Sequence, residues 1–192
     1  KGLFAAGDAA CSGLHGAALN SGDHLLGAIT SGAIAGSTAA TFANSSKHSG
    51  SSEISIALSE AHHFHDSMLS SVGSEGVNVG SIQSDLASTM QTHMGVERNA
   101  SGLSQAAKTI TQLQETPVAL SDQSPIMNTE LVSLLRTRSL LEVASAAVSA
   151  AQAREETRGN HVRSDFPNTD SEPPNHSLTS MDGKVTSLPL RS

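Results

Sequence analysis

The 192-residue sequence predicts a mainly α chain, in which a strand and a helix left over from an α/β domain precede an antiparallel helical bundle. Apolar residues recur at helical spacing through most of the chain beyond residue 53. The chain instead opens with a short apolar run that ends in Gly7-Asp8, a pattern typical of a buried strand entering a tight turn. Aromatic residues make up only 2% of the chain, without Trp or Tyr, which argues against an aromatic-rich β-sandwich.

The first domain is expected over residues 1–44, with a strand at residues 3–6 and a helix at residues 23–42. Asp23 is a candidate N-cap for that helix. One face of the helix is apolar, formed by Leu25, Leu26, Ile29, Ala33 and Ile34. Its small residues (Gly32, Ala35, Gly36 and Ala39) permit close packing on a sheet or another helix. A Ser/Gly-rich linker is expected over residues 45–52.

A helical domain is expected over residues 53–166. Apolar spacing places helices near residues 54–68, 82–93 and 103–113, with a Gly/Ser loop at 72–80 and stops at Gly95 and Pro117. The longest helix is predicted over residues 128–158, with Asn128 or Thr129 as its cap and Gly159 after its last turn. At 1.5 Å per residue this helix is about 45 Å long.

The last segment, residues 167–192, is polar and rich in proline, so an extended C-terminal arm is expected there. Asp182-Gly183 is a sequence that turns a small hairpin.

Charge and cysteine content narrow the possible partners and the cellular compartment. The net charge of −7 makes nucleic acid or an anionic membrane surface a poor partner. The single cysteine, Cys11, excludes an internal disulfide and a Cys-based zinc site, and fits a reducing, cytoplasmic location. The most apolar stretch, residues 25–43, is interrupted by glycines, so no membrane insertion is expected. Because the chain begins with Lys1 in what reads as a core strand, we expect the C-terminal part of a larger protein.

Three segments resemble flavoproteins of the fumarate reductase, succinate dehydrogenase and L-aspartate oxidase family. The first, GLFAAGDAACSGLHGA at residues 2–17, is similar to the family's last FAD-contacting segment. The second, IQSDLASTMQTHMGVERNASGL at residues 82–103, resembles a helix of its C-terminal domain. The third, residues 131–167 ending in AREETRGNHVRSDFP, resembles the long helix and following motif of that domain. The ETRG form, the DFP ending and the late Asp-Gly favour L-aspartate oxidase within the family.

The resemblance implies FAD as the cofactor and the first domain as the end of an FAD-binding domain. A carboxylate at the end of a strand, here Asp8, lies where nucleotide cofactors bind and would accept hydrogen bonds from ribityl hydroxyls. Gly7 would let the backbone approach the cofactor, and the helix beginning near Asp23 would aim its N–H groups at the flavin ring. If the family resemblance is set aside, the alternative interpretation of this segment is an ordinary strand–turn–helix with no role in cofactor binding. The complete set of expected cofactor-binding residues is Gly7, Asp8, His15, Gly16, Asp23, His24 and Leu25.

The sequence also departs from the family pattern. Alignment on His15-Gly16-Ala17 places Ala18 and Leu19 where the family has Asn and a substrate-binding Arg, so no catalytic residue is assigned. A Leu side chain neither donates a hydrogen bond nor holds a dicarboxylate. The GxGxxG fingerprint, the capping domain and the family's upstream catalytic His are absent from this sequence. We therefore expect the isolated chain to bind FAD weakly at best and to be inactive.

A second polar cluster comprises Arg154, Arg158, His161, Arg163 and Asp165. One hypothesis is that these cations close over the cofactor domain and stabilise anionic groups there. The other, which we favour, is a structural domain-docking role, with cations complementing the helix dipole and pairing with Glu155, Glu156 and Asp165.

Histidines at positions 62, 63 and 65 lie close to Asp66. His62 and Asp66 have a spacing that two metal ligands can use, but no third ligand is identified, so we expect a solvated cluster and no metal. Cys11 is expected to be a small core residue rather than a nucleophile.

Two classes of function follow. The first is the C-terminal portion of an L-aspartate oxidase-like flavoprotein, which oxidises L-aspartate to iminoaspartate for NAD biosynthesis. Its within-family alternative is a fumarate reductase or succinate dehydrogenase flavoprotein. The second class is a non-catalytic helical interaction module. For either enzyme, the expected partners are the remaining FAD-binding and capping domains and a dicarboxylate substrate.

Overall fold

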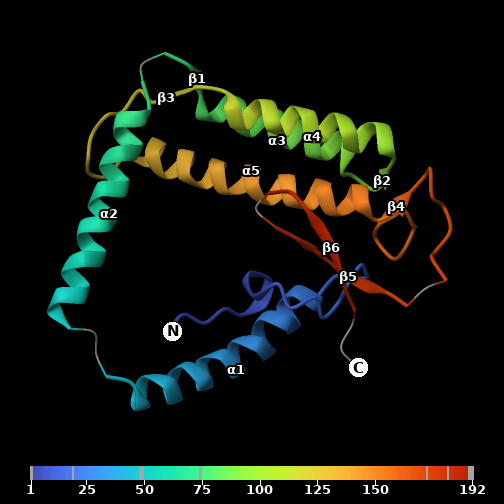
Figure 1. Cartoon of the computed structure of the whole chain (residues 1–192), viewed down its shortest axis with the longest axis horizontal. Coiled ribbons are helices and arrows are strands. Elements are labelled where there is room, and N and C mark those ends of the chain that lie inside the picture. Colours follow the sequence, from blue (N-terminus) through green and yellow to red (C-terminus); the bar gives the residue numbers. More distant parts are fainter. Residues whose placement is uncertain are drawn as a thin grey trace. The chain divides into compact units, whose positions relative to one another are not determined.

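The structure is a computed structural model that describes residues 2–18, 20–47, 50–73, 75–171, 173–180 and 182–189 (Figure 1). Leu19, which aligns with the family's substrate-binding arginine, lies outside the described residues. The chain divides into two compact units, Lys1–Leu58 and Ser59–Ser192. The unit boundary falls inside helix α2 (Ser51–Ser71), whereas the sequence predicts a linker at residues 45–52, near the end of α1 (Asp23–Ser45).

The strand expected at residues 3–6 is wrong. This segment has no ladder partner and leads into a short 3-10 helix, η1 (Gly7–Ala10). Leu3 is 95% exposed, so the run is not a core element here. A strand is stabilised by pairing with a neighbour, and the described residues of the first unit contain no other strand.

Helix α1 (Asp23–Ser45) confirms the helix expected from residue 23, but it begins differently. Gly22 is its N-cap, with φ 96° and no side-chain hydrogen bond, so the expected Asp23 cap is wrong. Asp23 is instead the first helical residue, and its carboxylate accepts a 2.7 Å hydrogen bond from the Asn20 amide.

No residue of α1 is buried in the structure. The apolar face predicted from sequence exists, yet Leu25 and Ile34 are 67% and 66% exposed. Helix α1 has 23 residues and contains an 18-residue window with a mean hydropathy of 1.3, so it is also long and apolar enough to cross a membrane. That indication rests on length and composition alone, and core helices of soluble proteins share both properties.

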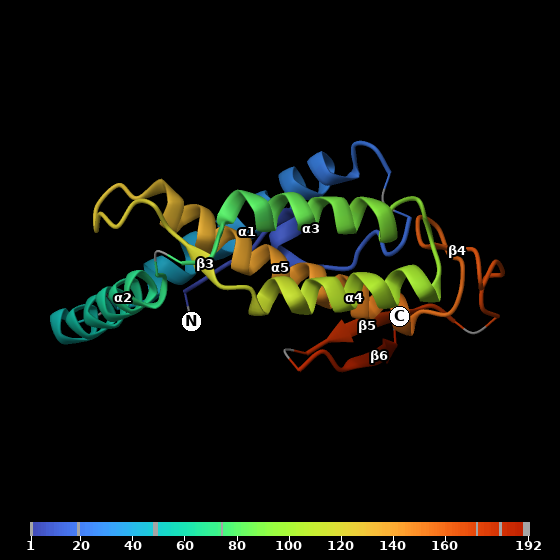
Figure 2. The same cartoon turned by 90° about the horizontal axis from the view of Figure 1, so that it is seen from above.

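The second unit contains the bundle. Figure 2 shows α3 (Val79–His93), α4 (Ala100–Glu115) and α5 (Thr129–Ala153) side by side, with α4 running opposite to the other two. Two apolar clusters fill the unit. One is centred on α3, α4 and α5 and contains Ile82, Leu86, Ala106, Ile110, Leu141, Ala144 and Val148. The other lies where α2 ends and α5 begins, and contains Met68, Val72, Val79, Leu120, Leu131 and Leu134.

Short parallel strand pairs join the ends of the bundle. β1 (Val77–Asn78), inside the expected 72–80 loop, pairs with β3 (Val118–Ala119). At the other end, β2 (Glu97–Arg98) pairs with β4 (Val162–Arg163). Each of the three helices begins after an Asn whose side-chain oxygen accepts a hydrogen bond from a first-turn amide: Asn78, Asn99 and Asn128.

Helix α5 ends at Ala153, so the prediction of a helix to residue 158 is wrong at that end. Its 25 residues span about 37 Å. Arg154 is already extended, with φ −93° and ψ 94°. Gly159, at φ 56°, serves a tight turn in which Arg158 and His161 exchange backbone hydrogen bonds, and does not follow the helix directly.

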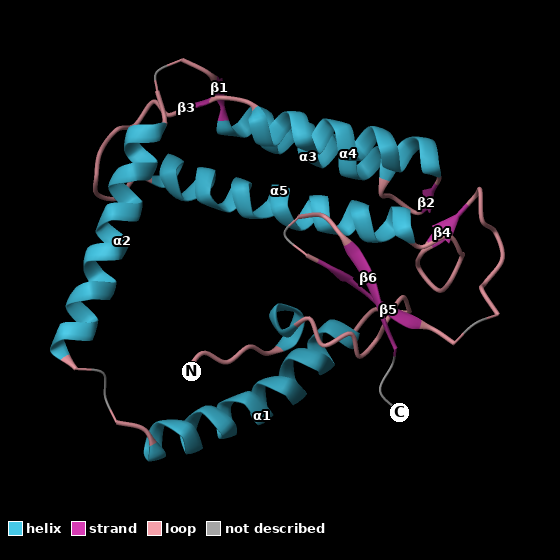
Figure 3. Cartoon of the chain, in the orientation of Figure 1, coloured by secondary structure: helices cyan, strands magenta, loops and turns pink. Residues whose placement is uncertain are grey.

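The C-terminal arm contains the expected hairpin, drawn as two magenta arrows in Figure 3. β5 (Asn175–Thr179) pairs antiparallel with β6 (Val185–Pro189). Gly183 supplies a positive φ of 77° in the turn, as expected for the Asp-Gly sequence. The hairpin contacts α5, where the Thr179 hydroxyl donates a 3.4 Å hydrogen bond to the Ala146 carbonyl.

Candidate functional site

The N-terminus of α1 collects most of the residues expected to bind the cofactor. The Asp8 carboxylate lies 2.8 Å from His24 Nδ1, which joins η1 to the first turn of α1. Both side chains remain accessible, with exposed fractions of 76% for Asp8 and 57% for His24. The preceding glycine, Gly7, has φ 60° and donates its amide to the Ser31 hydroxyl at 2.8 Å. An added Cβ at Gly7 would sit 3.4 Å from Ala28, so this turn lies directly against α1.

The remaining residues of this set are placed unequally. His15 Nδ1 lies 3.8 Å from the Asp23 carboxylate, at the same end of α1. Gly16 has φ 52° in the turn between η1 and α1. Leu25 is exposed. The structure therefore joins Asp8, His15, Asp23 and His24 around one helix end.

This helix end presents polar side chains and backbone N–H groups. First-turn N–H groups carry partial positive charge, although that of Asp23 already donates to the Asn20 carbonyl at 3.1 Å. An exposed carboxylate beside them accepts hydrogen bonds from hydroxyls. Gly7 and Gly16 leave the backbone without side chains at the turns. None of the described residues of η1 or α1 is buried, so these residues supply an edge and no enclosing walls.

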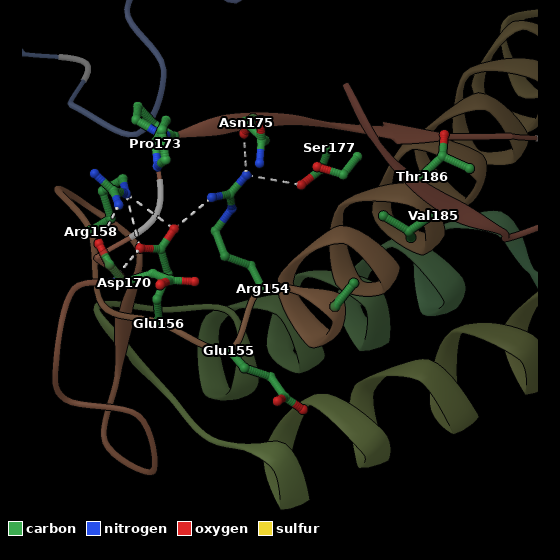
Figure 4. Close-up of a pocket in the computed structure, with 13 residues that line it drawn as sticks. Arg154, Glu155, Glu156, Arg158, Asp170, Pro173, Asn175, Ser177, Val185 and Thr186 are labelled. Carbon is green, nitrogen blue, oxygen red and sulfur yellow. Dashed lines mark hydrogen bonds and ion pairs between the residues drawn. The ribbon is translucent and has the colours of Figure 1, made fainter. Parts of the chain in front are cut away.

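The expected arginine cluster separates into two groups. The first lines a pocket of about 350 Å³ between the end of α5 and the hairpin (Figure 4). Arg154 Nη1 donates to Glu156 at 2.7 Å, and its Nη2 donates to the Asn175 carbonyl at 2.6 Å and the Ser177 hydroxyl at 3.1 Å. Arg158 Nε donates to the same Glu156 carboxylate at 2.9 Å. Because the helix has ended, the two arginines do not share a helical face, which corrects the sequence interpretation.

Glu156 is the centre of this group. Burial alone would raise the pKa of its carboxyl, but hydrogen bonds from Arg158, the Asp170 amide and Arg154 outweigh burial and lower the pKa to about 2. The carboxylate is therefore ionised at neutral pH and holds both guanidinium groups. Since the arginines direct donors into the chain itself, this group functions as a clasp for the hairpin and the preceding loop.

The second group joins the start of α4 to the C-terminal end of α5. Arg163 is 2% exposed, and its Nε and Nη2 form a bidentate pair with Asp165, each at 2.8 Å. Its Nη1 donates to the carbonyls of Ala151 and Arg154, at the C-terminal end of α5, where carbonyls lack a partner within the helix. Asp165 also accepts the Ala100 amide at 2.8 Å, at the start of α4. The Arg163 hydrogen bond lowers the pKa of Asp165, and the same pair raises the pKa of Arg163.

His161 completes the second group as a neutral ring. Burial is the main reason that its pKa is lowered, and the charges of Arg98, Arg154 and Arg163 lower it further. Arg98 Nη1 lies 2.9 Å from His161 Nδ1, while Nε2 lies 3.0 Å from the Arg154 carbonyl. Nδ1 is therefore assigned as the acceptor and Nε2 as the donor.

Sequence reasoning missed Arg98 and underestimated Glu156. Arg98 lies in β2, 63 residues from its partner His161, so no local sequence pattern predicts this contact. Glu156 was named only as one of several pairing acids. Its position between two arginines, two residues from each, was the available signal.

The histidines of α2 do not gather around one point. His65 lies 3.3 Å from Asp66, its chain neighbour. Within the described part of the chain, no three His, Cys, Asp or Glu side chains are placed to hold a metal ion. Cys11 is exposed, which corrects the expectation of a core residue. It follows η1 with φ 45°, at the rim of the turn rather than inside an apolar cluster.

Comparison with known proteins places this architecture. The family described as "Fumarate reductase flavoprotein C-term" matches residues 83–190. A fumarate reductase flavoprotein subunit of Mycobacterium tuberculosis is 36% identical over 89% of this chain and 30% of its own length. A succinate dehydrogenase flavoprotein subunit of Rickettsia bellii is 34% identical over 96% of this chain and 31% of its own length. A solved quinol fumarate reductase of E. coli superposes with a TM-score of 0.82 at 25% identity, over 97% of this chain and 33% of that chain.

The chain thus spans about a third of the length of these relatives. Those named relatives are fumarate reductases and succinate dehydrogenases, which favours that alternative over L-aspartate oxidase. The matched region covers most of α3 and all of α4, α5 and the hairpin, which lie in the compact second unit. The chain belongs to the fumarate reductase/succinate dehydrogenase family of FAD-binding flavoproteins and carries their C-terminal helical domain.

Proposed function

We propose that this chain is the C-terminal portion of a fumarate reductase or succinate dehydrogenase flavoprotein. The observation that carries the proposal is the family match over the bundle, together with the polar edge formed at the start of α1. In the whole protein, bound FAD would supply the redox chemistry that interconverts succinate and fumarate. The partners of this chain are then the remaining FAD-binding and capping parts of the flavoprotein. A cytoplasmic site for this portion stays a prediction from its free cysteine.

The chain's own residues would hold one end of the cofactor. The Asp8 carboxylate accepts ribityl hydroxyls, and the turns at Gly7 and Gly16 leave room for close backbone approach. Asp23, His24 and Leu25 form the first turn of α1, whose N–H groups face the flavin carbonyl region. His15, beside Asp23, lies at the same edge. The contact between Asp8 and His24 positions both groups at the edge before the cofactor binds.

The C-terminal helical domain would serve as a scaffold. Arg154 and Arg158 are engaged by Glu156, and Arg163 by Asp165, so these residues hold the hairpin and the helix ends. In the domain-docking role that we assign to them, Arg154, Arg158, His161 and Arg163 keep the surface of this domain rigid, and that surface contacts the rest of the flavoprotein. Their guanidinium groups need not contact the cofactor.

Alignment at Ala18-Leu19 favours a second candidate, a family member that has lost turnover. The family resemblance places a substrate-binding arginine at Leu19 and an Asn at Ala18. An aliphatic side chain supplies neither the charge nor the bidentate donors that a dicarboxylate needs. A non-catalytic module would keep the helical domain and its clasps while losing this contact.

The test uses the whole flavoprotein that contains this chain. Purified protein is assayed for bound FAD, and then for flavin bleaching by succinate and by L-aspartate without oxygen. Stoichiometric FAD with bleaching by succinate supports the proposed enzyme. Bleaching by L-aspartate alone would establish the aspartate oxidase reading, and absence of FAD would overturn the flavoprotein proposal.

Leu19→Arg with Ala18→Asn separates the two family readings. A bidentate Arg–carboxylate contact is worth about 1.5–3 kcal/mol, so the double variant should bind a dicarboxylate roughly tenfold more tightly or better. Leu19→Lys is the matched control, because it adds charge without the planar fork. Unchanged dicarboxylate binding at unchanged FAD content would show that Leu19 is not at the substrate position.

A further inference from the structure

A buried histidine lies beside the short strands β2 and β4 at one end of the bundle (Figure 1). His161 is 7% exposed, and its Nδ1 lies 2.9 Å from Arg98 Nη1. Its Nε2 lies 3.0 Å from the Arg154 carbonyl, just after α5. Both ring nitrogens are engaged, with Nδ1 accepting and Nε2 donating, which is the pattern of a neutral imidazole. The ring therefore connects β2 to the end of α5.

Arg98 depends on this ring more than the neighbouring arginines do. Arg154 and Arg163 each pair with a carboxylate, whereas no ion pair joins Arg98 to a carboxylate among the described residues. The other side-chain hydrogen bond that the structure shows for Arg98 is long, 3.4 Å from Nε to the Gly95 carbonyl. The lone pair of His161 Nδ1 is therefore the main acceptor for the Arg98 guanidinium.

The strand pair that contains Arg98 is short. β2 and β4 have two residues each, and Arg98 lies opposite Arg163. The Ser164 amide and hydroxyl both donate to the Arg98 carbonyl, at 2.9 Å and 3.2 Å. So short a pair of strands is marginally stable by itself. The contact between Arg98 and His161 is therefore a substantial part of what keeps the pair closed.

Protonation of His161 would reverse its contact with Arg98. An imidazolium carries an N–H on both nitrogens, so Nδ1 would face the Arg98 donor with no lone pair to accept it. The added positive charge would also lie among Arg98, Arg154 and Arg163, which act on the ring from β2, the end of α5 and β4. The bond from Nε2 to the Arg154 carbonyl survives protonation, so the change falls on Arg98.

The carboxylates of this region stay ionised while His161 titrates. Hydrogen bonds outweigh burial and lower the pKa of Glu156 to about 2, and Arg163 holds the pKa of Asp165 below its usual range. Glu155 adds a further negative charge that favours the charged form of Arg163. Neither Glu156 nor Asp165 therefore releases its arginine above about pH 5.

We propose that His161 is a pH-sensitive switch on the β2–β4 pair. The neutral ring holds Arg98 and keeps the pair closed, whereas the protonated ring releases Arg98 and the pair opens while α3, α4 and α5 stay packed. Burial lowers the pKa of His161, so the pair is closed at pH 7. Opening is favoured as the pH falls below the ordinary value of 6.5, because an opened ring takes up a proton more readily. The switch does not depend on the proposed function.

Hydrogen exchange measured by NMR on the full chain tests the switch between pH 7 and pH 5. After correction for intrinsic exchange, protection of the Ser164 amide should fall about tenfold, because its acceptor is the Arg98 carbonyl. The Ile110 amide, in the core of α4, should remain at least about a hundredfold more protected at each pH, since it exchanges through global unfolding. Unchanged protection at Ser164, or equal protection of Ser164 and Ile110, would overturn the proposal.

His161→Gln separates titration of the ring from its contacts. The Gln amide offers an oxygen to Arg98 and an NH2 group to the Arg154 carbonyl but does not titrate, so Ser164 protection should be equal at both pH values. His176→Gln removes a titrating ring from β5 and should keep the response of the unmodified chain. A pH response that persists in His161→Gln would overturn the assignment to this ring.

Arg98→Met tests the other side of the same contact. It removes the donor that His161 holds, so Ser164 should be about tenfold less protected at pH 7 and should show little further change at pH 5. Far-UV circular dichroism confirms that each variant keeps its helices. Full protection of Ser164 in Arg98→Met would overturn the proposal, because the pair would then stay closed without the contact.

Discussion

The two units of this chain use similar helices very differently. Helix α1 in the first unit has an apolar face, yet none of its residues is buried. Helix α5 in the second unit has a similar length and buries residues from Leu131 to Ala151 against two neighbouring helices. An amphipathic pattern therefore predicts that one face of a helix is apolar, whereas only the tertiary structure shows whether that face is buried within this chain.

The largest expected difference lies in amide hydrogen exchange. Amides of α4 and α5 should exchange only through global unfolding, because they lie at a packed core. Amides of α1 should exchange by local opening, orders of magnitude faster, since packing contributes little to that helix. Exchange followed by NMR on the full chain measures both at once. Equal protection of α1 and α5 would break the comparison.

Arg163→Ala should cause the largest loss of stability among single substitutions. It leaves the helix-end carbonyls and Asp165 without their buried partner, at a cost of about 3–5 kcal/mol. His24→Ser in the first unit removes an exposed pair and should cost about 1 kcal/mol or less. Urea unfolding of both variants gives the two values. Similar losses would show that the exposed pair is coupled to more than its own contact.

Leu134→Ala tests the same contrast with apolar side chains. Leu134 is 2% exposed, so its truncation should leave a cavity and cost about 2–5 kcal/mol. Ile34→Ala, at a position 66% exposed, should change the free energy of unfolding by about 0.5 kcal/mol or less. The midpoint of chemical denaturation distinguishes the two outcomes. A large effect at Ile34 would reveal a partner for the α1 face.

Acid should weaken the second unit through Glu156. The folded-state pKa of Glu156, about 2, lies below the ordinary value of 4.5, so its stabilisation is complete above about pH 4.5. It is lost as the pH falls from 4.5 towards 2, by up to about 3 kcal/mol. His161 adds a loss that starts higher, as the pH falls below its ordinary pKa of 6.5, because burial lowers the folded-state pKa. Stability measured from pH 7 to pH 3 should decline, and Glu156→Gln should flatten the lower part of that decline.

The smallest expected contrast concerns the starts of the helices. Asn128→Ala removes the side-chain cap of α5 and its bonds to the Asp122 and Ser124 carbonyls, and should cost about 1 kcal/mol. Asp23→Ala removes a first-turn carboxylate from α1, together with the acceptor of the Asn20 amide, and should cost about 0.3–1 kcal/mol. Helicity of both variants at 222 nm, together with urea midpoints, resolves the difference. A larger loss of stability in Asp23→Ala than in Asn128→Ala would show that α1, not α5, has the more strongly stabilised N-terminus.

Local sequence information predicted the helices and the hairpin well. The start of α5 and the stop before Pro117 follow from apolar spacing and end signals. The turn of the β5–β6 hairpin follows from Asp182-Gly183, because glycine adopts a positive φ without a steric penalty. The resemblance to the flavoprotein family came from short motifs in the right order. These features depend on residues close together in the chain.

Tertiary structure decided what depends on distant partners. The run at residues 3–6 resembles a strand, but a strand forms only beside another one. Helix α5 ends at Ala153 because Arg163, ten residues further along, binds the last carbonyls and turns the chain. The central position of Glu156 in the clasp depends on contacts with the hairpin and the preceding loop, which the local sequence does not predict. Local periodicity fixes which face of a segment is apolar, whereas burial, helix ends and charge pairing follow from contacts that no local pattern encodes.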